Sequence, residues 1–446
     1  PALGHNNQLG WTNTVNRADL IDTYKLVLDA SGDKYRYDGQ WRPLERRRVW
    51  LPVRFGPFVI PVPRTVARSV QGPVLENQLG AFAVRFAGMG DVRQVEQYYR
   101  LNKARDFAEW QQVMAMQAVP ATNFIYADAA GNIGMFYNAR FPQRATGFDW
   151  KGVLPGDTSK AVWKSYVPFA GYPQVINPPS GWVANSNNTP FIATAPGDNL
   201  DASKFAPELG IETFITNRAL RFQSLIAALG DAPIDRDTLL AIKYDKAYDR
   251  ASWAGERQRE ILALDFKDAP DLAKAQKLLS TWDFVQDGQG DADALAAVMV
   301  NSISALAYFG DALPDAREDF TAQVKFLDTA FGRLDPPLAT LQRVQRGNVD
   351  LGVLGAPEVL RAIHARRDEK LGRLVGQGGD SFIMLVEWDK AGAVRSESIV
   401  QYGAATARET SPHYNDQAKL FVAEQFKPNW LTAAALAAHT ESDRRP

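Results

Sequence analysis

The sequence predicts an α+β fold in which strand-rich segments at both ends of the chain flank a mainly helical stretch. Three observations support this. Short extended runs separated by turns dominate residues 35–100. Apolar side chains recur every three or four residues through most of 231–375, as in amphipathic helices. Extended runs return over 381–402. We therefore expect a β-rich part over 1–230, a helical excursion over 231–375, and strands and a helix over 376–446 that complete the first part.

The composition excludes several classes of protein. A chain of 446 residues with 46% hydrophobic content can bury a large core. Its formal net charge is −1 and the charges are interspersed, so we expect neither a nucleic-acid partner nor a membrane partner. The absence of cysteine excludes disulfides, thiolate metal sites and cysteine nucleophiles. No apolar run in the sequence is long enough to span a bilayer.

The first elements are predicted by their residue types. β-Branched and aromatic residues favour strands over 9–15 and 23–28. A hairpin is expected over 35–41, because its central Asp-Gly pair suits the positive φ angles of a tight turn. Apolar residues at helical spacing then predict one helix over 92–116.

The remaining elements follow in order along the chain. Two extended runs joined by a Gly-Asn turn predict a hairpin over 122–136. The helical period predicts helices over 211–229, 236–248, 257–264, 272–282, 292–309, 316–331 and 357–371. Near the end we expect strands over 381–388 and 396–402, and a helix that runs to Phe426.

A short polar loop joins the first two predicted strands. Asp19 and Asp22 flank Ile21 there, and two carboxylates with a main-chain carbonyl are hard oxygen ligands of the kind that calcium takes. The alternative is that these aspartates are solvated turn formers. The residues alone leave both interpretations open.

Four segments, in a fixed order, resemble one family. They are GHNNQLGWTNTVNRADLIDTYKL at 4–26, TNFIYADAAGNIGMF at 122–136, GWVANSNNTP at 181–190 and SPHYNDQAKLF at 411–421. Together they resemble the β subunit of the penicillin acylase family, N-terminal-nucleophile amidohydrolases that include penicillin, cephalosporin, glutaryl and acyl-homoserine-lactone acylases. The resemblance covers nearly the whole chain. It implies an αββα sandwich, in which helices cover both faces of antiparallel sheets.

The resemblance also implies an oxyanion hole, the pair of donors that stabilises the tetrahedral intermediate of amide hydrolysis. By position these donors are the main-chain N–H of Val15 and the side-chain amide of Asn187, and Arg218 braces the loop that carries Asn187. Neutral donors suit this role because they do not titrate near neutral pH. From the residues alone, the Asn-Ser-Asn-Asn run could be merely a turn.

A substrate pocket and a calcium site are implied in the same way. The walls of the acyl pocket would include Leu3, Asn13, Thr122, Asn123 and Phe124, although packing residues would look the same. Structural calcium would be bound by Asp19, Ile21 and Asp22, together with Asp198 and the carbonyl of Trp150. A further ligand in the family comes from the other subunit.

The nucleophile of this chemistry is a Ser, Thr or Cys exposed as a first residue, whose own amine accepts the hydroxyl proton. Pro1 cannot serve. In the family a serine begins the β subunit, before the segment that starts at Gly4, so we expect this chain to lack the start of that subunit and the α subunit, and to be inactive alone. His413 is not expected to be the base, and the four histidines show no HExxH spacing.

Two classes of function stay open. The first is part of an amidase that hydrolyses a linear amide, such as a penicillin or an acyl-homoserine lactone, through an acyl-enzyme. The family implies that such a protein is periplasmic or secreted. The second class is a non-catalytic binding or interaction protein that keeps the fold. A carbohydrate-active enzyme with paired carboxylates is more remote, because the ordered motifs argue against it.

Overall fold

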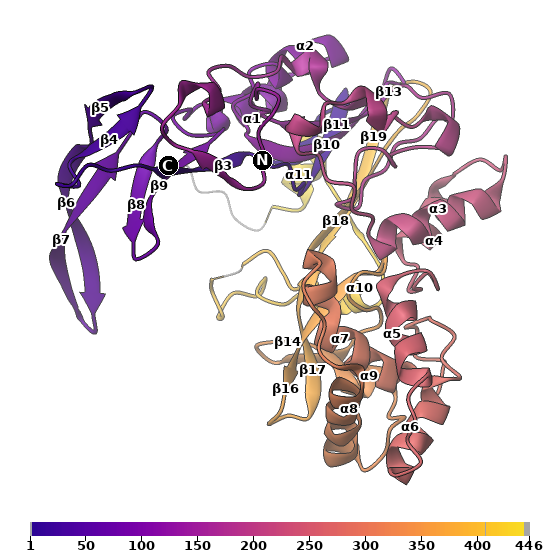
Figure 1. Cartoon of the computed structure of the whole chain (residues 1–446). Helices are drawn as coiled ribbons and strands as arrows, with labels where there is room; N and C mark the ends of the chain where they lie inside the picture. Colours follow the sequence, from indigo (N-terminus) through magenta and orange to yellow (C-terminus); the bar gives the residue numbers. More distant parts are fainter. Residues whose placement is uncertain (1, 406, 441–446) are drawn as a thin grey trace. The chain divides into compact units, whose positions relative to one another are not determined.

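The computed structural model describes residues 2–405 and 407–440, so Pro1 lies outside it. The chain divides into two compact units, residues 1–214 (unit 1) and 215–446 (unit 2) (Figure 1). The predicted division into three parts stays a prediction. None of the helices in the described ranges has both the length and the apolar character that crossing a bilayer requires.

A five-stranded antiparallel sheet in unit 1 carries most of the predicted site. Its strands lie in the order β1 (Gly4–His5), β2 (Leu9–Thr14), β10 (Ala121–Asp128), β11 (Ile133–Ala139) and β13 (Gln174–Ile176). Helices α1 (Gln94–Lys103) and α2 (Phe107–Met114) pack against this sheet through one buried cluster. At its centre Trp110 is fully buried, with ring centroids 4.9 Å from Tyr126 and 5.0 Å from Phe136. The hairpin predicted over 122–136 is confirmed as β10 and β11.

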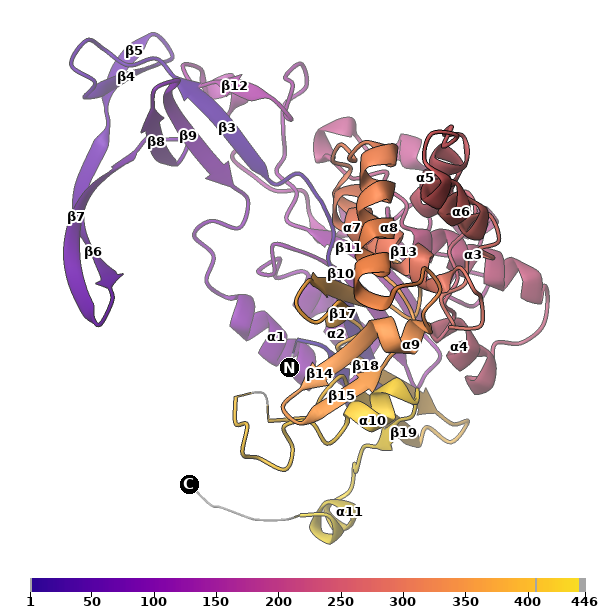
Figure 2. The same ribbon diagram turned by 90° about the horizontal axis from the view of Figure 1, so that it is seen from below.

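A second, six-stranded sheet holds much of the rest of unit 1. Its order is β12 (Val153–Pro155), β3 (Ile21–Leu26), β9 (Gly80–Phe86), β8 (Pro73–Asn77), β7 (Phe58–Arg68) and β6 (Glu45–Phe55). The long β6–β7 hairpin extends beyond the other strands of unit 1 in both views (Figure 1, Figure 2). Because β2 belongs to the first sheet and β3 to the second, residues 15–20 cross between them, and we call these residues the crossing segment. It carries Val15 and Asp19.

Short 3-10 helices occupy the loops of unit 1 after β12. They are η1 (Ser159–Ala161), η2 (Phe169–Gly171), η3 (Pro196–Asp198), η4 (Ala202–Lys204) and η5 (Pro207–Leu209). The chain from 177 to 214 has no strand, and main-chain hydrogen bonds such as those from Ala184 to Ala193 (2.8 Å) and from Thr189 to Phe214 (2.9 Å) order it together with side-chain bonds.

Two predictions for unit 1 differ in outcome. The hairpin over 35–41 is confirmed as β4 (Lys34–Tyr37) and β5 (Gln40–Pro43), with φ of 48° at Asp38 and 76° at Gly39. The single helix over 92–116 is wrong, because the structure has the two helices α1 and α2 there. Asp106 starts the second one: its backbone is extended, and its side chain accepts a hydrogen bond from the N–H of Glu109 at 2.8 Å.

Unit 2 consists of helices and two small sheets. The helices are α3 (Asn217–Leu229), α4 (Arg236–Lys243), α5 (Trp253–Leu262), α6 (Pro270–Leu279), α7 (Asp293–Phe309), α8 (Ala316–Phe331), α9 (Leu338–Leu341), α10 (Ala418–Val422) and α11 (Ala433–Ala438). One sheet has the order β15 (Val349–Gly352), β14 (Gln342–Arg346), β17 (Arg373–Gly379) and β16 (Ile363–Asp368), and the other has β18 (Phe382–Trp388), β19 (Val394–Val400) and β20 (Lys427–Pro428). Most of α7 is buried within the main core of this unit.

The helix predicted over 357–371 is wrong. Residues Ile363–Asp368 form strand β16, which pairs antiparallel with β17. Glu358 has φ of 63°, outside the range of a right-handed helix. Val359 and Ile363 are four residues apart and both fully buried, which is the spacing of one face of a helix. In the structure, however, Ile363 begins strand β16 and Val359 lies in the bend before it.

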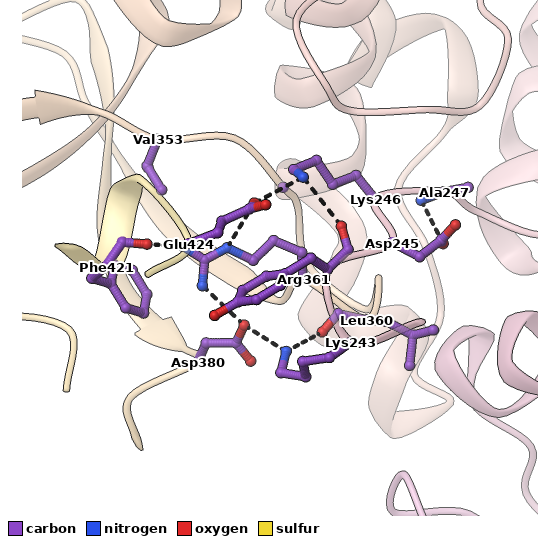
Figure 3. Close-up of polar contacts among 12 residues, drawn as sticks. Lys243, Asp245, Lys246, Ala247, Val353, Leu360, Arg361, Asp380, Phe421 and Glu424 are labelled. Carbon is purple, nitrogen blue, oxygen red and sulfur yellow. Dashed lines mark hydrogen bonds and ion pairs between the residues drawn. The ribbon is translucent and has the colours of Figure 1, made fainter. Parts of the chain in front are cut away.

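A buried network of charges joins the end of α4, the loop before β18 and the turn after α10 (Figure 3). Arg361 is 1% exposed, pairs with Asp380 at 3.1 Å and donates to the main-chain oxygen of Phe421 at 2.7 Å. Lys243 pairs with the same carboxylate at 2.8 Å. Burial lowers the pKa of Lys243, although Asp380 opposes that change. Glu424 lies 3.6 Å from the Nε of Arg361. The network places two cations on one largely buried carboxylate, that of Asp380.

A buried carboxylate at the start of α7 predicts a pH dependence of stability. Asp293 is 1% exposed, and one of its oxygens accepts hydrogen bonds from the N–H groups of Gly288 (2.8 Å) and Gly290 (3.3 Å). Burial raises the pKa of Asp293 from 3.8 to about 6. Between these values the folded protein binds more protons than the unfolded chain, so the free energy of unfolding falls as the pH rises.

Asp293→Asn should remove this fall in the free energy of unfolding with rising pH, because the amide is neutral and its oxygen can still accept hydrogen bonds. At pH 7 we expect the variant to be more stable than the wild type by roughly 1–3 kcal/mol, with no difference below about pH 4. Urea unfolding at several pH values measures this. Asp291→Asn changes an exposed aspartate of the same loop and should not alter the pH dependence. If the free energy of unfolding of Asp293→Asn differed from that of the wild type by the same amount at every pH, Asp293 would not be the source of the pH dependence.

Candidate active site

The two predicted oxyanion donors lie beside each other in unit 1. Val15 directly follows β2, and the loop that carries Asn187 returns to it from 172 residues further along the chain. The Nδ2 of Asn187 donates to the main-chain oxygen of Val15 at 2.9 Å. Asn187 has φ of 63°, a left-handed conformation that asparagine tolerates. The structure therefore brings the two residues together, and their role as oxyanion donors stays a prediction.

Asn185 ties this loop to the sheet. Its Oδ1 accepts hydrogen bonds from the Thr14 hydroxyl (2.5 Å) and the Asn123 Nδ2 (3.2 Å). The same oxygen accepts a bond from the main-chain N–H of Asn187 at 2.9 Å. Thr14 and Asn123 are paired residues of β2 and β10, so one side chain joins the loop to both strands. The main chain of Asn187 is therefore held against the ends of these two strands.

Replacing Asn185 with alanine should destabilise unit 1. The change leaves the Asn123 amide and the Thr14 hydroxyl without this acceptor, and we expect a loss of about 1–3 kcal/mol in the free energy of unfolding. Chemical denaturation of the complete protein measures the loss. Asn77→Ala is the matched control, because Asn77 is exposed and its oxygen accepts a hydrogen bond from the N–H of Leu79, a near neighbour in the same turn, at 2.8 Å. Equal losses in both variants would show that other contacts hold the loop.

The predicted pocket residues of β2 and β10 point to both faces of the sheet. Asn13 lies opposite Phe124, and Thr14 lies opposite Asn123. Successive side chains of a strand alternate between faces. Asn13 donates to the hydroxyl of Tyr98 on α1 at 2.9 Å, so this face meets the helices. Asn123 faces the other side, toward the loop of Asn187.

The other wall residues lie close to the same strands. The Thr122 hydroxyl donates to the main-chain oxygen of Thr14 at 3.0 Å. Leu3 is partly buried and directly precedes β1. Phe124 is fully buried, with its ring centroid 5.9 Å from that of Trp110. The sheet thus gathers these residues, and their contact with an acyl chain stays a prediction.

An arginine occupies the predicted calcium loop. The fully buried side chain of Arg144 pairs with Asp22 at 2.8 Å and with Asp19 at 3.2 Å. The second oxygen of Asp22 accepts a hydrogen bond from the Trp163 Nε1 at 2.5 Å. Burial raises the pKa of Asp22, and the charge of Arg144 opposes that rise. Both oxygens of Asp22 therefore have partners supplied by the protein.

The other predicted calcium ligands do not complete a cation site. Trp150 presents its ring to Arg144, with the guanidinium carbon 5.2 Å from the ring centroid. Ile21 begins β3, and Asp198 accepts a hydrogen bond from the main-chain N–H of Ser180 at 2.8 Å. No group of three or more His, Cys, Asp and Glu among the described residues could hold a metal ion. The residues as placed do not fit calcium, whose presence stays a prediction.

Arg218 belongs to unit 2. It lies in the first turn of α3 and pairs with Glu358 at 3.1 Å. The loop of Asn187 belongs to unit 1, and the bracing of that loop by Arg218 stays a prediction.

Sequence reasoning missed the groups that order the crossing segment. Glu212 accepts hydrogen bonds from the main-chain N–H of Arg17 (3.0 Å) and from the Tyr137 hydroxyl. Arg144 pairs with a carboxylate 122 residues away, and no local pattern marks such a pair. Asn185 did carry a signal, because it opens the Asn-Ser-Asn-Asn run. Its role as the central acceptor could not be told from that of a turn residue.

Known proteins resemble this chain in sequence. The family model described as Penicillin amidase matches residues 1–438. Penicillin G acylase of Escherichia coli is 34% identical over 193 residues, which are 42% of this chain and 22% of that protein. Acyl-homoserine lactone acylase QuiP of Pseudomonas fluorescens is 26% identical over 340 residues, which are 73% of this chain and 40% of that protein. The chain therefore matches less than half the length of these relatives.

A solved structure has the same fold. Thermostable penicillin G acylase from Alcaligenes faecalis matches with a TM-score of 0.66 and 18% identity, over 99% of this chain and 89% of that chain. This similarity confirms the predicted α+β fold of an N-terminal-nucleophile hydrolase. Because the family model spans all but the last few residues, the chain belongs to the penicillin amidase family.

Proposed function

We propose that the complete protein hydrolyses the linear amide bond of a small acyl amide, such as a penicillin or an acyl-homoserine lactone. The single observation that carries the proposal is the contact between the Asn187 amide and the main chain of Val15, at 2.9 Å. Family membership and the activities named for the relatives support the same reaction class.

The proposed reaction divides between this chain and a nucleophile outside it. An N-terminal serine attacks the carbonyl carbon of the amide, and its hydroxyl proton passes to its own amine. The carbonyl oxygen becomes an oxyanion, to which the N–H of Val15 and the amide of Asn187 donate. The C–N bond then breaks, the amine leaves with the proton, and water hydrolyses the acyl ester. Each oxyanion donor lowers the barrier by about 3 kcal/mol.

We also propose that the rest of the protein supplies the serine, a partner subunit and the remainder of the pocket. The fractions of the two relatives that this chain matches, 22% and 40%, support this. Asn13, Thr122 and Phe124 would then form one wall and contribute to the choice of acyl chain. A periplasmic or secreted location is part of the proposal.

A direct assay tests the proposal. The complete gene product is purified, its processed N-terminus is sequenced, and p-nitroanilides with acyl chains of increasing length are offered as substrates. We expect an N-terminal serine and release of p-nitroaniline from part of the series. The proposal would be overturned if the protein carried a free N-terminal serine but cleaved neither these amides nor a penicillin nor an acyl-homoserine lactone. A non-catalytic binding protein would then be favoured.

A further inference from the structure

The Arg144 guanidinium lies among oxygen atoms of the kind that bind hard cations. Its Nη2 donates to the Oδ1 of Asp22 at 2.8 Å, and its Nη1 donates to the Oδ2 of Asp19 at 3.2 Å. The main-chain oxygen of Glu208 accepts a third bond, at 3.1 Å. Carboxylates and main-chain carbonyls are the kinds of oxygen donor that calcium loops use. A covalently attached cation therefore fills the centre of that set.

The surrounding chain closes on this ion pair. The carbonyl of Gly210 accepts the N–H of Asp19 at 3.1 Å. Gly210 has φ of 62°, and a Cβ there would lie 2.6 Å from the Cβ of Asp19 and 3.5 Å from the Nη1 of Arg144. The loop that ends at Gly210 thus packs directly on the carboxylate and the guanidinium. A planar fork of N–H groups suits this arrangement, because it can bond two carboxylates along fixed directions.

We propose that the Arg144 guanidinium takes the place of a metal ion in this loop, so that the crossing segment is ordered without calcium. Asp19 and Asp22 are then held by a charge that the chain itself carries. The stabilisation by a bound ion grows with the logarithm of its concentration relative to its Kd and is lost when the ion is diluted or chelated, whereas a side-chain cation cannot be removed in this way. The proposal concerns the order of the crossing segment and does not depend on amide hydrolysis.

Terbium(III) is the probe for this proposal, because it binds calcium-type oxygen sites and nearby tryptophans sensitise its luminescence. Trp163 donates to Asp22, and Trp150 lies against Arg144. In the complete protein, Arg144→Ala should bind terbium at least tenfold more tightly than the wild type, because the buried carboxylate of Asp22 and the partly buried carboxylate of Asp19 lose their cation. Added calcium chloride should raise the melting temperature of this variant only.

Arg140→Ala is the matched control. Arg140 is also largely buried in unit 1, at 15% exposure, but it pairs with a single carboxylate, that of Asp91, at 3.1 Å. Its loss opens no site with two carboxylates, so terbium binding should stay at the wild-type level. Equal terbium binding by the wild type and Arg144→Ala, whether strong or weak, overturns the proposal.

Asp19→Asn keeps the test decisive if Arg144→Ala does not fold. Asp19 is 25% exposed, so this change is milder. The proposal expects EDTA to change the melting temperatures of the wild type and Asp19→Asn by the same amount, because no metal ion lies on Asp19. A drop caused by EDTA in the wild type and missing in Asp19→Asn would place a metal ion in the loop and overturn the proposal.

Discussion

Asn187→Ala in the complete, processed protein should lower kcat for amide hydrolysis by about 10²–10³-fold. The Asn187 amide lies 2.9 Å from the main-chain oxygen of Val15, beside the other proposed donor, and alanine cannot donate. Because the donor acts on charge that develops in the transition state, kcat should fall much more than KM changes. Steady-state kinetics on a p-nitroanilide substrate, with the melting temperature as a check of folding, measures the effect.

Two further variants separate the amide from the backbone. Asn187 has φ of 63°, where alanine is strained and glycine is not. Both residues lack the side-chain amide, so Asn187→Gly should lose as much activity as Asn187→Ala if the loss comes from the amide and not from backbone strain. Val15→Ala keeps the main-chain N–H and changes only a side chain that is 68% exposed, so its kcat should stay near the wild-type value. Wild-type activity in Asn187→Gly would remove the amide from the mechanism.

Arg361→Ala should strongly destabilise unit 2. Arg361 is 1% exposed, bonds the main-chain oxygen of Phe421 and pairs with Asp380 (Figure 3). Its removal leaves the largely buried carboxylate of Asp380 with Lys243 as its remaining cation and a carbonyl without its donor, and breaking a fully buried pair costs about 3–5 kcal/mol, which is the upper end of the loss we expect. Denaturant unfolding followed by tryptophan fluorescence measures the loss of free energy.

Arg373→Ala is the comparison for that variant. Arg373 pairs with Asp350 at 3.1 Å, and the two side chains are 34% and 43% exposed. An exposed pair of this kind contributes about 1 kcal/mol or less. If Arg361→Ala cost no more than Arg373→Ala, the buried network would be dispensable to stability.

Local patterns predicted those elements whose cause is local. The turn at Asp38 and Gly39 requires positive φ angles that this residue pair favours, and the hairpin follows from it. The helical period predicted α7 because its apolar residues extend over the whole of 293–309. Periodicity failed over 357–371, because apolar residues four positions apart also occur where a turn leads into a strand. It also overlooked Asp106, whose capping side chain divides one apolar run into two helices.

The candidate site was predictable where a motif marks it and unpredictable where distant residues meet. Val15 and Asn187 were placed by the resemblance, and the fold brings them into contact. The calcium loop illustrates the opposite case. Asp19 and Asp22 have the spacing of metal ligands, but the cation that faces them is Arg144, more than a hundred residues later. A carboxylate pair in a sequence indicates that a positive charge is needed and does not say which one supplies it.

The bond between Thr14 and Asn185 has a consequence for how this chain folds. It joins positions 171 residues apart, and its acceptor also orders the backbone of Asn187. Contacts of such long range form only after the intervening chain has collapsed and its sheets have paired, since closing a large loop costs entropy that the bond alone does not offset. A chain in which residues 14–185 have not yet folded therefore lacks this arrangement, and gains it only when that segment has reached its native topology.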